Sequence, residues 1–395
     1  MTRLYLIRHA QAEGNLYRRM HGWYDSLITD TGYRQIAALT GRFDGVPIDA
    51  VYSSPLCRCK TTARAIYVPH HLPLQIEPGL IEIGIGVWED VPFGDVQVHD
   101  PERMRLFGEV SPAYEVEGGE TYQQVQERMV EAIFKIADAN PSKTVACFSH
   151  GMVIRTALSW FHGYGLEGIG KVPHSDNTGV ACIEVEGRDV RVLFEADNSH
   201  LPMEISTIVR QRGRGEERTV FAMGNANLWF RPWRPYEEKE LYFRYRHEAW
   251  VDIHGREAFF DGEAFYQAAL RASLEEPKSV MVAYLGEEIV GMIQMDLDRD
   301  TKNGVCFVPF VYMNPTHRHK GLGVQLIGQA VSTARPLGRD KLRLRCAPTN
   351  QIAKRFYTRN GFRKIGMAQD SQVPLELLEK DIGYPKDDEL LAISR

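Results

Sequence analysis

The chain has 395 residues, of which 44% are apolar and 25% charged, with a formal net charge of −5; this composition indicates a globular protein too long for one ordinary domain. No apolar run reaches the roughly eighteen residues of a membrane span, and the N-terminus lacks a signal-peptide layout, so we expect a cytoplasmic protein with no membrane partner. The six cysteines are too scattered for a disulfide framework, which predicts buried free thiols at Cys57, Cys59, Cys147, Cys182, Cys306 and Cys346.

The first half of the chain alternates short apolar runs with amphipathic segments. Strands are predicted for "RLYLI" (3–7), "AVYSS" (50–54), "TVACFS" (144–149) and "ACIEV" (181–185), and the apolar spacing of 31–43 and 122–140 predicts helices. This alternation is typical of an α/β fold, in which a largely parallel sheet is covered by helices on both faces.

A change of composition separates the two halves. Residues 210–227 are rich in glycine and charge and lack helical or strand periodicity, as a linker does. We therefore expect a first domain over 1–205, a linker over 206–226, a second domain over 227–385 and a C-terminal tail over 386–395.

The second half reads as strands in succession followed by helices. Strands are predicted at 227–235, 279–286, 288–297, 305–313 and 341–347, and helices near 236–250, 262–275, 322–335 and 350–359. This order favours a mixed α+β sheet.

Charge is distributed unevenly between the halves. Residues 1–205 hold 18 Lys and Arg against 27 Asp and Glu, whereas 206–395 hold 29 against 25. The basic excess is concentrated in 301–369, with 13 basic residues and one acid, Asp340. Such a block predicts a polyanionic ligand, with a solvated basic face or a nucleic-acid surface as alternatives.

Three predicted strands of the first half end at residues suited to binding an anion. Arg8 and His9 follow the first strand, Arg58 lies in the first turn of the helix after the second, and His150 follows "TVACFS". Ligands of open α/β sheets bind beyond the carboxyl ends of the strands, so these side chains should meet at one edge. Two guanidinium groups and two imidazoles there predict a pocket for a phosphoryl group, which an unprotonated imidazole can accept as a nucleophile.

These residues resemble the histidine phosphatase superfamily, which includes the cofactor-dependent phosphoglycerate mutases. The resemblance covers about residues 1–200 and includes "HGWYDSLITDTGYRQ" (21–35) and the Glu in "LIEIGIGVWED" (80–90). It implies a three-layer α/β/α phosphoglycerate mutase-like domain in which His9 forms the phosphohistidine. It also implies that Arg8, Arg58 and His150 bind the phosphoryl oxygens and that Glu82 is the proton donor.

The resemblance does not fix the roles of two residues, Asn15 and Ala10. Asn15 either touches the phosphate or satisfies backbone groups of its own loop. Ala10 stands where the family has glycine, and its methyl group could narrow the pocket or restrict φ.

The choice between hydrolysis and transfer depends on what reaches the phosphohistidine. The segment between Glu82 and His150 is shorter than the resemblance implies for the glycolytic mutases. We therefore predict hydrolysis of a small phosphorylated metabolite, with mutase-type phosphoryl transfer as the alternative.

A second motif lies in "VPFVYMNPTHRHKGLGVQLIGQA" (308–330), a strand, a turn and glycines at a helix start, where backbone N–H groups can approach a diphosphate. Arg318, Gly321 and Gly323 resemble motif A of the GNAT acyltransferases. The later stretch "TNQIAKRFYTRNGFRKIG" (349–366) is similar to another stretch of the same family, with Asn350, Ala353, Phe356, Tyr357, Gly361 and Phe362 in order.

The GNAT resemblance implies acetyl-CoA as co-substrate and an amine as acyl acceptor. It places the pantetheine along the backbone amides of Val311, Tyr312 and Met313, and adds Asn350 to the cofactor site. The pyrophosphate would lie in the loop of Arg318, His319, Lys320, Gly321, Leu322 and Gly323. Two roles are open for Tyr357: it would protonate the departing thiolate, or it would serve only as an aromatic side chain packed beside Phe356. The base that deprotonates the amine is left open among Glu287, Glu288, Asp296 and Asp298.

Three function classes follow from the two halves together. The first is a bifunctional phosphatase and N-acetyltransferase, and the second is a phosphatase with a non-catalytic acetyl-CoA-sensing module. A nucleic-acid surface is the third, which the diphosphate-loop pattern and the few aromatic residues in the basic block disfavour. We expect no metal, because Arg8 and Arg58 would repel a cation from His9 and His150.

Overall fold

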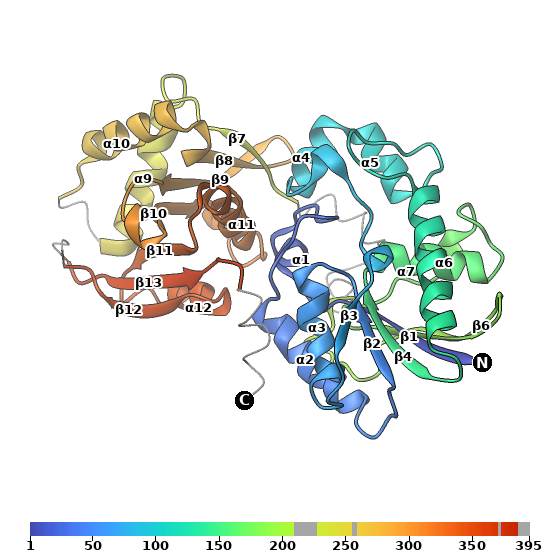
Figure 1. Cartoon of the computed structure of the whole chain (residues 1–395). Coiled ribbons are helices and arrows are strands. Elements are labelled where there is room, and N and C mark those ends of the chain that lie inside the picture. Colours follow the sequence, from blue (N-terminus) through green and yellow to red (C-terminus); the bar gives the residue numbers. More distant parts are fainter. Residues whose placement is uncertain (209–226, 255–258, 370–372, 386–395) are drawn as a thin grey trace. The chain divides into compact units, whose positions relative to one another are not determined.

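The computed structural model describes residues 1–208, 227–254, 259–369 and 373–385, which form two compact units (Figure 1). The first unit comprises Met1–Val91 and 96–208, and the second comprises Pro92–Asp95 and 227–385. Most of the predicted linker 206–226 and all of the predicted tail 386–395 lie outside the described residues.

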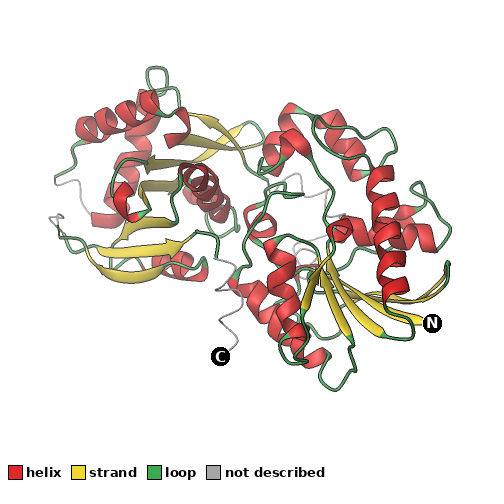
Figure 2. Ribbon diagram, viewed as in Figure 1, coloured by secondary structure: helices red, strands yellow, loops and turns green. Residues whose placement is uncertain are grey.

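A six-stranded sheet in the order β3-β2-β4-β1-β5-β6 forms the centre of the first unit (Figure 2). The bounds are β1 Thr2–Arg8, β2 Ala50–Ser53, β3 Leu74–Ile76, β4 Thr144–Ser149, β5 Val180–Glu186 and β6 Asp189–Asp197. Strands β3, β2, β4 and β1 run parallel, and β5 and β6 extend the sheet antiparallel. Leu4, Leu6 and Ile7 are fully buried, as expected for a strand covered on both faces.

Helices cover both faces of this sheet. Helices α2 (Asp30–Arg42) and α3 (Cys57–Tyr67) pack on one face, where Leu39, Phe43, Val51 and Phe148 join one core cluster. The other face carries α6 (Tyr122–Ala139), which begins with a capping box, and α7 (Gly151–Phe161) (Figure 1). The remaining helices of this part of the chain are α1 Glu13–Tyr17, α4 Phe93–His99 and α5 Pro101–Gly108. The predicted three-layer α/β/α fold is confirmed.

The second unit is built on a seven-stranded sheet in the order β12-β13-β11-β10-β9-β8-β7. The strands are β7 Trp229–Pro232, β8 Val280–Leu285, β9 Glu288–Asp296, β10 Val305–Met313, β11 Lys341–Cys346, β12 Arg363–Met367 and β13 Glu376–Asp381. Only β10 and β11 are parallel neighbours among these strands. The predicted mixed sheet is confirmed, although β12 and β13 were not predicted.

Two layers of helices flank the second sheet. Helices α9 (Lys239–His254) and α10 (Gly262–Glu275) bury an aromatic core against β8, β9 and β10 that includes Trp233, Tyr242, Phe310 and Tyr312. Helix α11 (Gly323–Ala334) contacts β9, β10 and β11, and α12 (Gln351–Arg359) places Phe356 beside the first residue of α11.

The pairing between strands β10 and β11 ends about halfway along β10. Their parallel ladder joins Val305–Val308 to Lys341–Leu344, and a register shift in β10 lies between Phe307 and Phe310. In the described structure, residues 310–313 continue the ladder with β9, while β11 continues with β13. One edge of β10 is thereby opened near its C-terminal end.

Much of the basic block is paired within the fold. Strand β13 supplies Glu376, which contacts Lys354 and Lys364, and Glu379, which binds Arg343 at 2.7 Å. Asp381 of the same strand pairs with Arg363. The excess that the sequence count assigns to 301–369 is therefore partly neutralised by acids beyond that range, which weakens the argument for a polyanion-binding face.

The cysteines and the helices bear on two expectations drawn from composition. All six cysteines are buried and free, as predicted. Within the described residues, no helix combines the length and the apolar character that crossing a membrane requires.

Candidate active sites

The structure brings His9, Arg58 and His150 together at the carboxyl ends of β1, β2 and β4. The ring centroids of His9 and His150 lie 5.2 Å apart, and Arg58 Nε donates to His150 Nδ1 at 3.2 Å. Arg8 lies against the start of α7, because a Cβ placed on Gly151 would be 3.1 Å from Arg8 Nε. The predicted convergence of the three strand ends is therefore present.

The orientation of the His9 ring is fixed by the backbone. His9 Nδ1 lies 2.7 Å from the carbonyl oxygen of Ala10, which can only accept, so Nδ1 carries the proton and Nε2 keeps its lone pair. Burial, together with the charges of Arg58 and Arg8, lowers the pKa of His9 well below its usual value. The ring is thus neutral at neutral pH and presents a nucleophilic nitrogen.

His150 is held by two side chains. Its Nδ1 accepts from Arg58, so Nε2 carries the proton and donates to Ser54 Oγ at 2.8 Å. Burial and the charge of Arg58 lower the pKa of this ring as well.

The two arginines differ in how their donors are used. Arg58 is fully buried and donates to the carbonyls of Tyr24 at 2.9 Å and Gly22 at 2.7 Å, which ties it to the loop after α1. Arg8 donates from Nη1 to the Ser175 carbonyl, whereas its buried Nε has no hydrogen-bond partner among the described residues. A buried donor without a partner beside His150 fits an anion-binding role.

Glu82 lies at the N-terminus of the helix that His150 caps. Its Oε1 accepts from the amides of Ile83 at 3.0 Å and Val153 at 3.2 Å. The partial positive charge of a helix N-terminus stabilises a carboxylate there. The predicted proton donor and His150 thus flank the same helix start.

Asn15 is engaged by its own loop. Its Oδ1 accepts from the amide of Ala12 at 3.0 Å, and its Nδ2 lies 3.1 Å from His21 Nε2. Of the two alternatives for this residue, the structure shows the one in which it satisfies loop groups, and a phosphate contact stays a prediction.

Two residues beside His9 were not found from the sequence. The buried His21 ring packs edge-on against His9 with centroids 5.9 Å apart, and Asn177 Nδ2 donates to the His9 carbonyl at 3.0 Å. Both come from loops. His21 stands in the stretch that resembles the superfamily, so its position was visible, but nothing in the sequence separates it from its neighbours.

Ala10 is accommodated without backbone strain. Its φ is not positive, its amide donates to Thr62 Oγ1 at 2.9 Å, and its side chain belongs to a small buried cluster with Ala12 and Ile28. The methyl group therefore packs into the protein interior on ordinary backbone angles, which do not require glycine.

The open edge of β10 presents the backbone of Val311 and Met313. The Asn314 amide donates to the Val290 carbonyl of β9 at 2.8 Å, and alternate residues of an antiparallel strand face the same neighbour. The Tyr312 amide therefore faces β9, while those of Val311 and Met313 face the opening. This alternation argues against the Tyr312 amide as a pantetheine contact.

The loop between β10 and α11 carries the second sequence motif and makes a tight turn before the helix. His319 and Gly321 have positive φ values of 62° and 76°, and Leu322 caps α11 without a side-chain hydrogen bond in the described structure. Lys320 is exposed in the same loop. Arg318 fastens the loop, because it donates to the Met313 carbonyl at 2.9 Å and pairs with Asp252.

The predicted residues of α12 have structural contacts of their own. Asn350 is the N-cap of this helix and accepts from the Ala353 amide at 3.0 Å. The Tyr357 ring packs between Phe356 and Phe362, and burial raises its pKa. A raised pKa keeps the hydroxyl protonated, as a proton donor requires, so the packing role and the acid role of Tyr357 are compatible.

A carboxylate absent from the sequence-based candidates lies near β10. Glu248 of α9 accepts a hydrogen bond from the Tyr312 hydroxyl. Among the predicted candidates, Asp296 accepts from backbone amides in its own turn, and Glu288 lies 3.5 Å from His317. Glu248 has no motif around it, and only the position of α9 across β10 reveals it.

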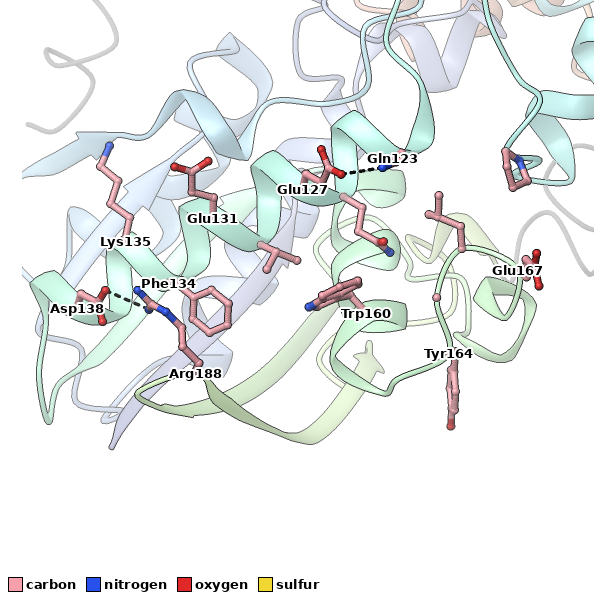
Figure 3. A pocket seen from close by; sticks show the side chains of 15 residues that line it. Gln123, Glu127, Glu131, Phe134, Lys135, Asp138, Trp160, Tyr164, Glu167 and Arg188 are labelled. Atoms are coloured by element: carbon pink, nitrogen blue, oxygen red, sulfur yellow. Dashed lines mark hydrogen bonds and ion pairs between the residues drawn. The ribbon is translucent and has the colours of Figure 1, made fainter.

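A groove of about 1020 Å³ lies elsewhere on the first unit (Figure 3). Residues of α6 and the end of α7 line it, including Glu127, Phe134 and Trp160. Helix α7 has 11 residues and spans about 16 Å, so Trp160 near its end is far from His150 at its start. None of the predicted site residues lines this groove, and it is distinct from the phosphoryl site.

Neither site contains a recognisable metal cluster. Among the described residues, no group of three or more His, Cys, Asp or Glu side chains is placed to hold an ion. The two candidate sites are therefore described by their own side chains.

Comparison with known proteins identifies both domains. Residues 4–198 match the family model of the histidine phosphatase superfamily (branch 1), and residues 230–362 match that of the acetyltransferase (GNAT) family. The chain thus contains a histidine phosphatase domain followed by a GNAT acetyltransferase domain. Both predicted resemblances are confirmed, in the predicted order.

Several relatives match about half of the chain. Phosphoserine phosphatase 1 of Hydrogenobacter thermophilus is 29% identical over 196 residues, which are 48% of this chain and 89% of the relative. The probable phosphoglycerate mutase GpmB of Cronobacter sakazakii is 28% identical over 163 residues, 41% of this chain and 76% of the relative. The solved structure of Bacillus stearothermophilus YhfR is 32% identical and covers 51% of this chain and 99% of its own, with a TM-score of 0.49.

Proposed function

We propose that the first domain hydrolyses a small phosphorylated metabolite through a phosphohistidine at His9. The observation that carries this proposal is the hydrogen bond from His9 Nδ1 to the Ala10 carbonyl, which leaves Nε2 as the nucleophile. The unpartnered Nε of Arg8 and the nearby Arg58 support it, because guanidinium groups stabilise charge on phosphoryl oxygens.

The reaction proceeds in two displacements. Nε2 of His9 attacks phosphorus, the ester P–O bond breaks, and Glu82 gives a proton to the departing alkoxide. Glu82 then takes a proton from the water that attacks the phosphohistidine, which releases inorganic phosphate and restores both residues.

Hydrolysis is distinguished from transfer by the products. A panel of phosphorylated metabolites is incubated with the intact chain, and ³¹P NMR separates inorganic phosphate from a new phosphoester. Inorganic phosphate as the product supports hydrolysis, which the short segment between Glu82 and His150 favours. A rearranged phosphoester would establish the mutase alternative, to which one relative's name points.

Replacing Glu82 with glutamine is expected to lower kcat/KM, which reports formation of the phosphohistidine alone, by about 10²-fold for an alkyl phosphate, because the alkoxide then leaves without a proton. For p-nitrophenyl phosphate the loss should be below about tenfold, since nitrophenolate leaves readily unprotonated. Phosphate release from both esters measures the two effects. Glu115→Gln, an exposed position in the same domain, is the matched control. Equal losses on both esters would contradict the proton-donor role.

We also propose that the second domain transfers the acetyl group of acetyl-CoA to an amine. The open edge at Val311 and Met313, followed by the 318–323 loop, supports this placement of the coenzyme. Glu248 accepts the proton of the amine, nitrogen attacks the thioester carbonyl, the C–S bond breaks, and Tyr357 protonates the thiolate. Glu248 is chosen because it reaches β10 through Tyr312.

Replacing Tyr357 with phenylalanine is expected to lower kcat for acetyl transfer roughly ten- to hundredfold while the KM for acetyl-CoA stays within about twofold, because only the proton of the leaving thiol is lost. Thiol release from acetyl-CoA with an amine panel measures this. Tyr236→Phe, at an exposed tyrosine of the same domain, is the control. Binding of acetyl-CoA without turnover of any amine would favour the sensor alternative.

A further inference from the structure

One cation of the second domain has no counter-ion and no role in the mechanism above. Arg246 of α9 lies between two aromatic rings, 4.1 Å from the Phe265 centroid and 4.7 Å from that of Phe310. Its Nη1 donates to the Pro309 carbonyl at 3.0 Å. No carboxylate among the described residues forms an ion pair with it, and its Nε and Nη2 have no hydrogen-bond partner there.

This placement leaves part of the guanidinium available to a ligand. A carbonyl and two ring faces cover some of the group, while the side chain is only partly buried and its Nε and Nη2 stay accessible. This partial burial lowers the pKa of Arg246. The two unused donors form the planar fork that binds a carboxylate through two parallel hydrogen bonds.

The position of Arg246 relates it to the reacting end of the coenzyme. Pro309 lies in the register shift of β10, just beyond Val308, where the ladder to β11 ends. With the diphosphate in the 318–323 loop, the pantetheine runs back past Met313 and Val311 toward residue 309. Val311 and Pro309 are about 7 Å apart along a strand, so Arg246 lies within reach of a molecule that attacks the thioester.

We infer that the acyl acceptor is an amino acid, an amine with a carboxylate close to its nitrogen, and that Arg246 binds this carboxylate. The inference rests on the proposed acetyl transfer and names its substrate class. Glu248, two residues along the same helix, contacts β10 at Tyr312 and supplies the opposite charge. The acceptor's ammonium gives one proton to Glu248 before the nitrogen attacks, and the nitrogen loses its second proton to solvent as the C–S bond breaks.

Pairs of acceptors that differ only in the carboxylate test this inference. The intact chain is assayed by thiol release from acetyl-CoA with phenylalanine and phenethylamine, leucine and isopentylamine, and lysine and cadaverine. Rates are compared at equal concentrations of unprotonated amine. We expect kcat/KM to be at least about tenfold higher for the amino acid in one or more pairs.

Variants of Arg246 separate recognition from folding. Arg246→Met should raise the KM of the preferred amino acid at least about tenfold and leave its decarboxylated partner within about twofold, while Arg246→Lys, which keeps the charge but loses the fork, should fall between. Arg244→Met, at an exposed arginine of the same helix, is the matched control and should change neither acceptor.

The outcomes distinguish this inference from the function on which it rests. Equal use of both members of every pair, or an equal loss for both in Arg246→Met and Arg246→Lys, would overturn the carboxylate role while acetyl transfer stands. Absence of turnover with every amine, although acetyl-CoA binds in a calorimeter, would overturn the transfer itself and the inference with it.

Discussion

Replacing His9 with alanine is expected to lower kcat for phosphate release by at least about 10³-fold, because the nitrogen that forms the covalent intermediate is removed. The remaining cations, Arg8 and Arg58, still bind the phosphoryl group but offer nothing that attacks it. Hydrolysis of p-nitrophenyl phosphate under saturation measures the loss. Rapid acid-free quenching with labelled substrate should trap a phosphoprotein in the native chain and none in the variant.

The control for this prediction must separate chemistry from folding, since His9 is 3% exposed. His9→Gln keeps an amide that can donate to the Ala10 carbonyl and should be equally inactive with a thermal transition close to that of the native chain. His70→Ala, at the end of α3 away from the strand ends, should retain full activity. Undiminished hydrolysis in both His9 variants would refute the phosphohistidine assignment.

The convergence of Arg8, His9, Arg58 and His150 could be predicted because it depends on local patterns. Each residue follows an apolar run that is buried on both faces, and parallel strands bring their carboxyl ends to one edge. The same reasoning could not find Asn177 or the tautomer of His9. Those depend on which loop packs beside β1 and on a single carbonyl, and neither leaves a periodic signal in the sequence.

Charge counting along the chain overstated the free basic charge of the second domain for a related reason. The block 301–369 looks strongly basic along the chain, yet Glu376 and Glu379 of β13 pair with Lys354, Lys364 and Arg343 across the sheet. Strand β12 was missed because "RKIGM" is largely exposed and lacks an apolar face. Both features depend on where β13 lies, beside β11 and β12 and against Lys354 of α12, and composition does not record it.

Arg246 and Glu248 are functional candidates that the sequence alone could not predict. Helix α9 was expected from its apolar spacing, but its contacts with Pro309 and Tyr312 arise only when it lies across β10. The proposed diphosphate loop, in contrast, is formed by consecutive residues. Its Gly321 has a positive φ, which favours glycine, so the sequence itself indicates a turn there. A local motif is thus enough to predict where the coenzyme binds in the second domain, whereas the proposed acceptor residues could be found only from the fold.

Three imidazoles of the candidate site are expected to lower the unfolding free energy of the first domain by about 4 kcal/mol between pH 7.5 and 5.5, in addition to the loss from His174 and His200, whose pKa values burial lowers to about 4. The pKa values of His9, His21 and His150 are held well below 6.5, chiefly by burial and then by Arg58. In the unfolded chain these three imidazoles therefore bind protons near pH 6.5, whereas in the folded chain they stay unprotonated at that pH. Stability falls as the pH drops through 6.5, by about 1.4 kcal/mol for each group over these two pH units.

Unfolding in urea, followed by pulsed hydrogen exchange of peptides from β1 and β4, measures this loss in the intact chain. The control is His21→Gln, whose amide can keep the contacts with Asn15 and Ser26 and does not titrate. This variant should lose about 1 kcal/mol less stability than the native chain over the same range. Equal stability at pH 7.5 and 5.5 would mean that the three rings titrate normally in the fold.

The same pKa shifts predict that catalysis and stability respond differently to acid. Because the pKa of His9 is depressed, its Nε2 stays unprotonated at pH 5.5, and kcat/KM per folded molecule should not follow a titration centred at 6.5. Inorganic phosphate, whose negative charge offsets Arg8 and Arg58, should raise the unfolding midpoint at pH 5.5, although it competes with substrate and so does not raise the rate. An acid limb at pH 6.5 in fully folded protein would contradict the placement of two guanidinium groups against a neutral nucleophile.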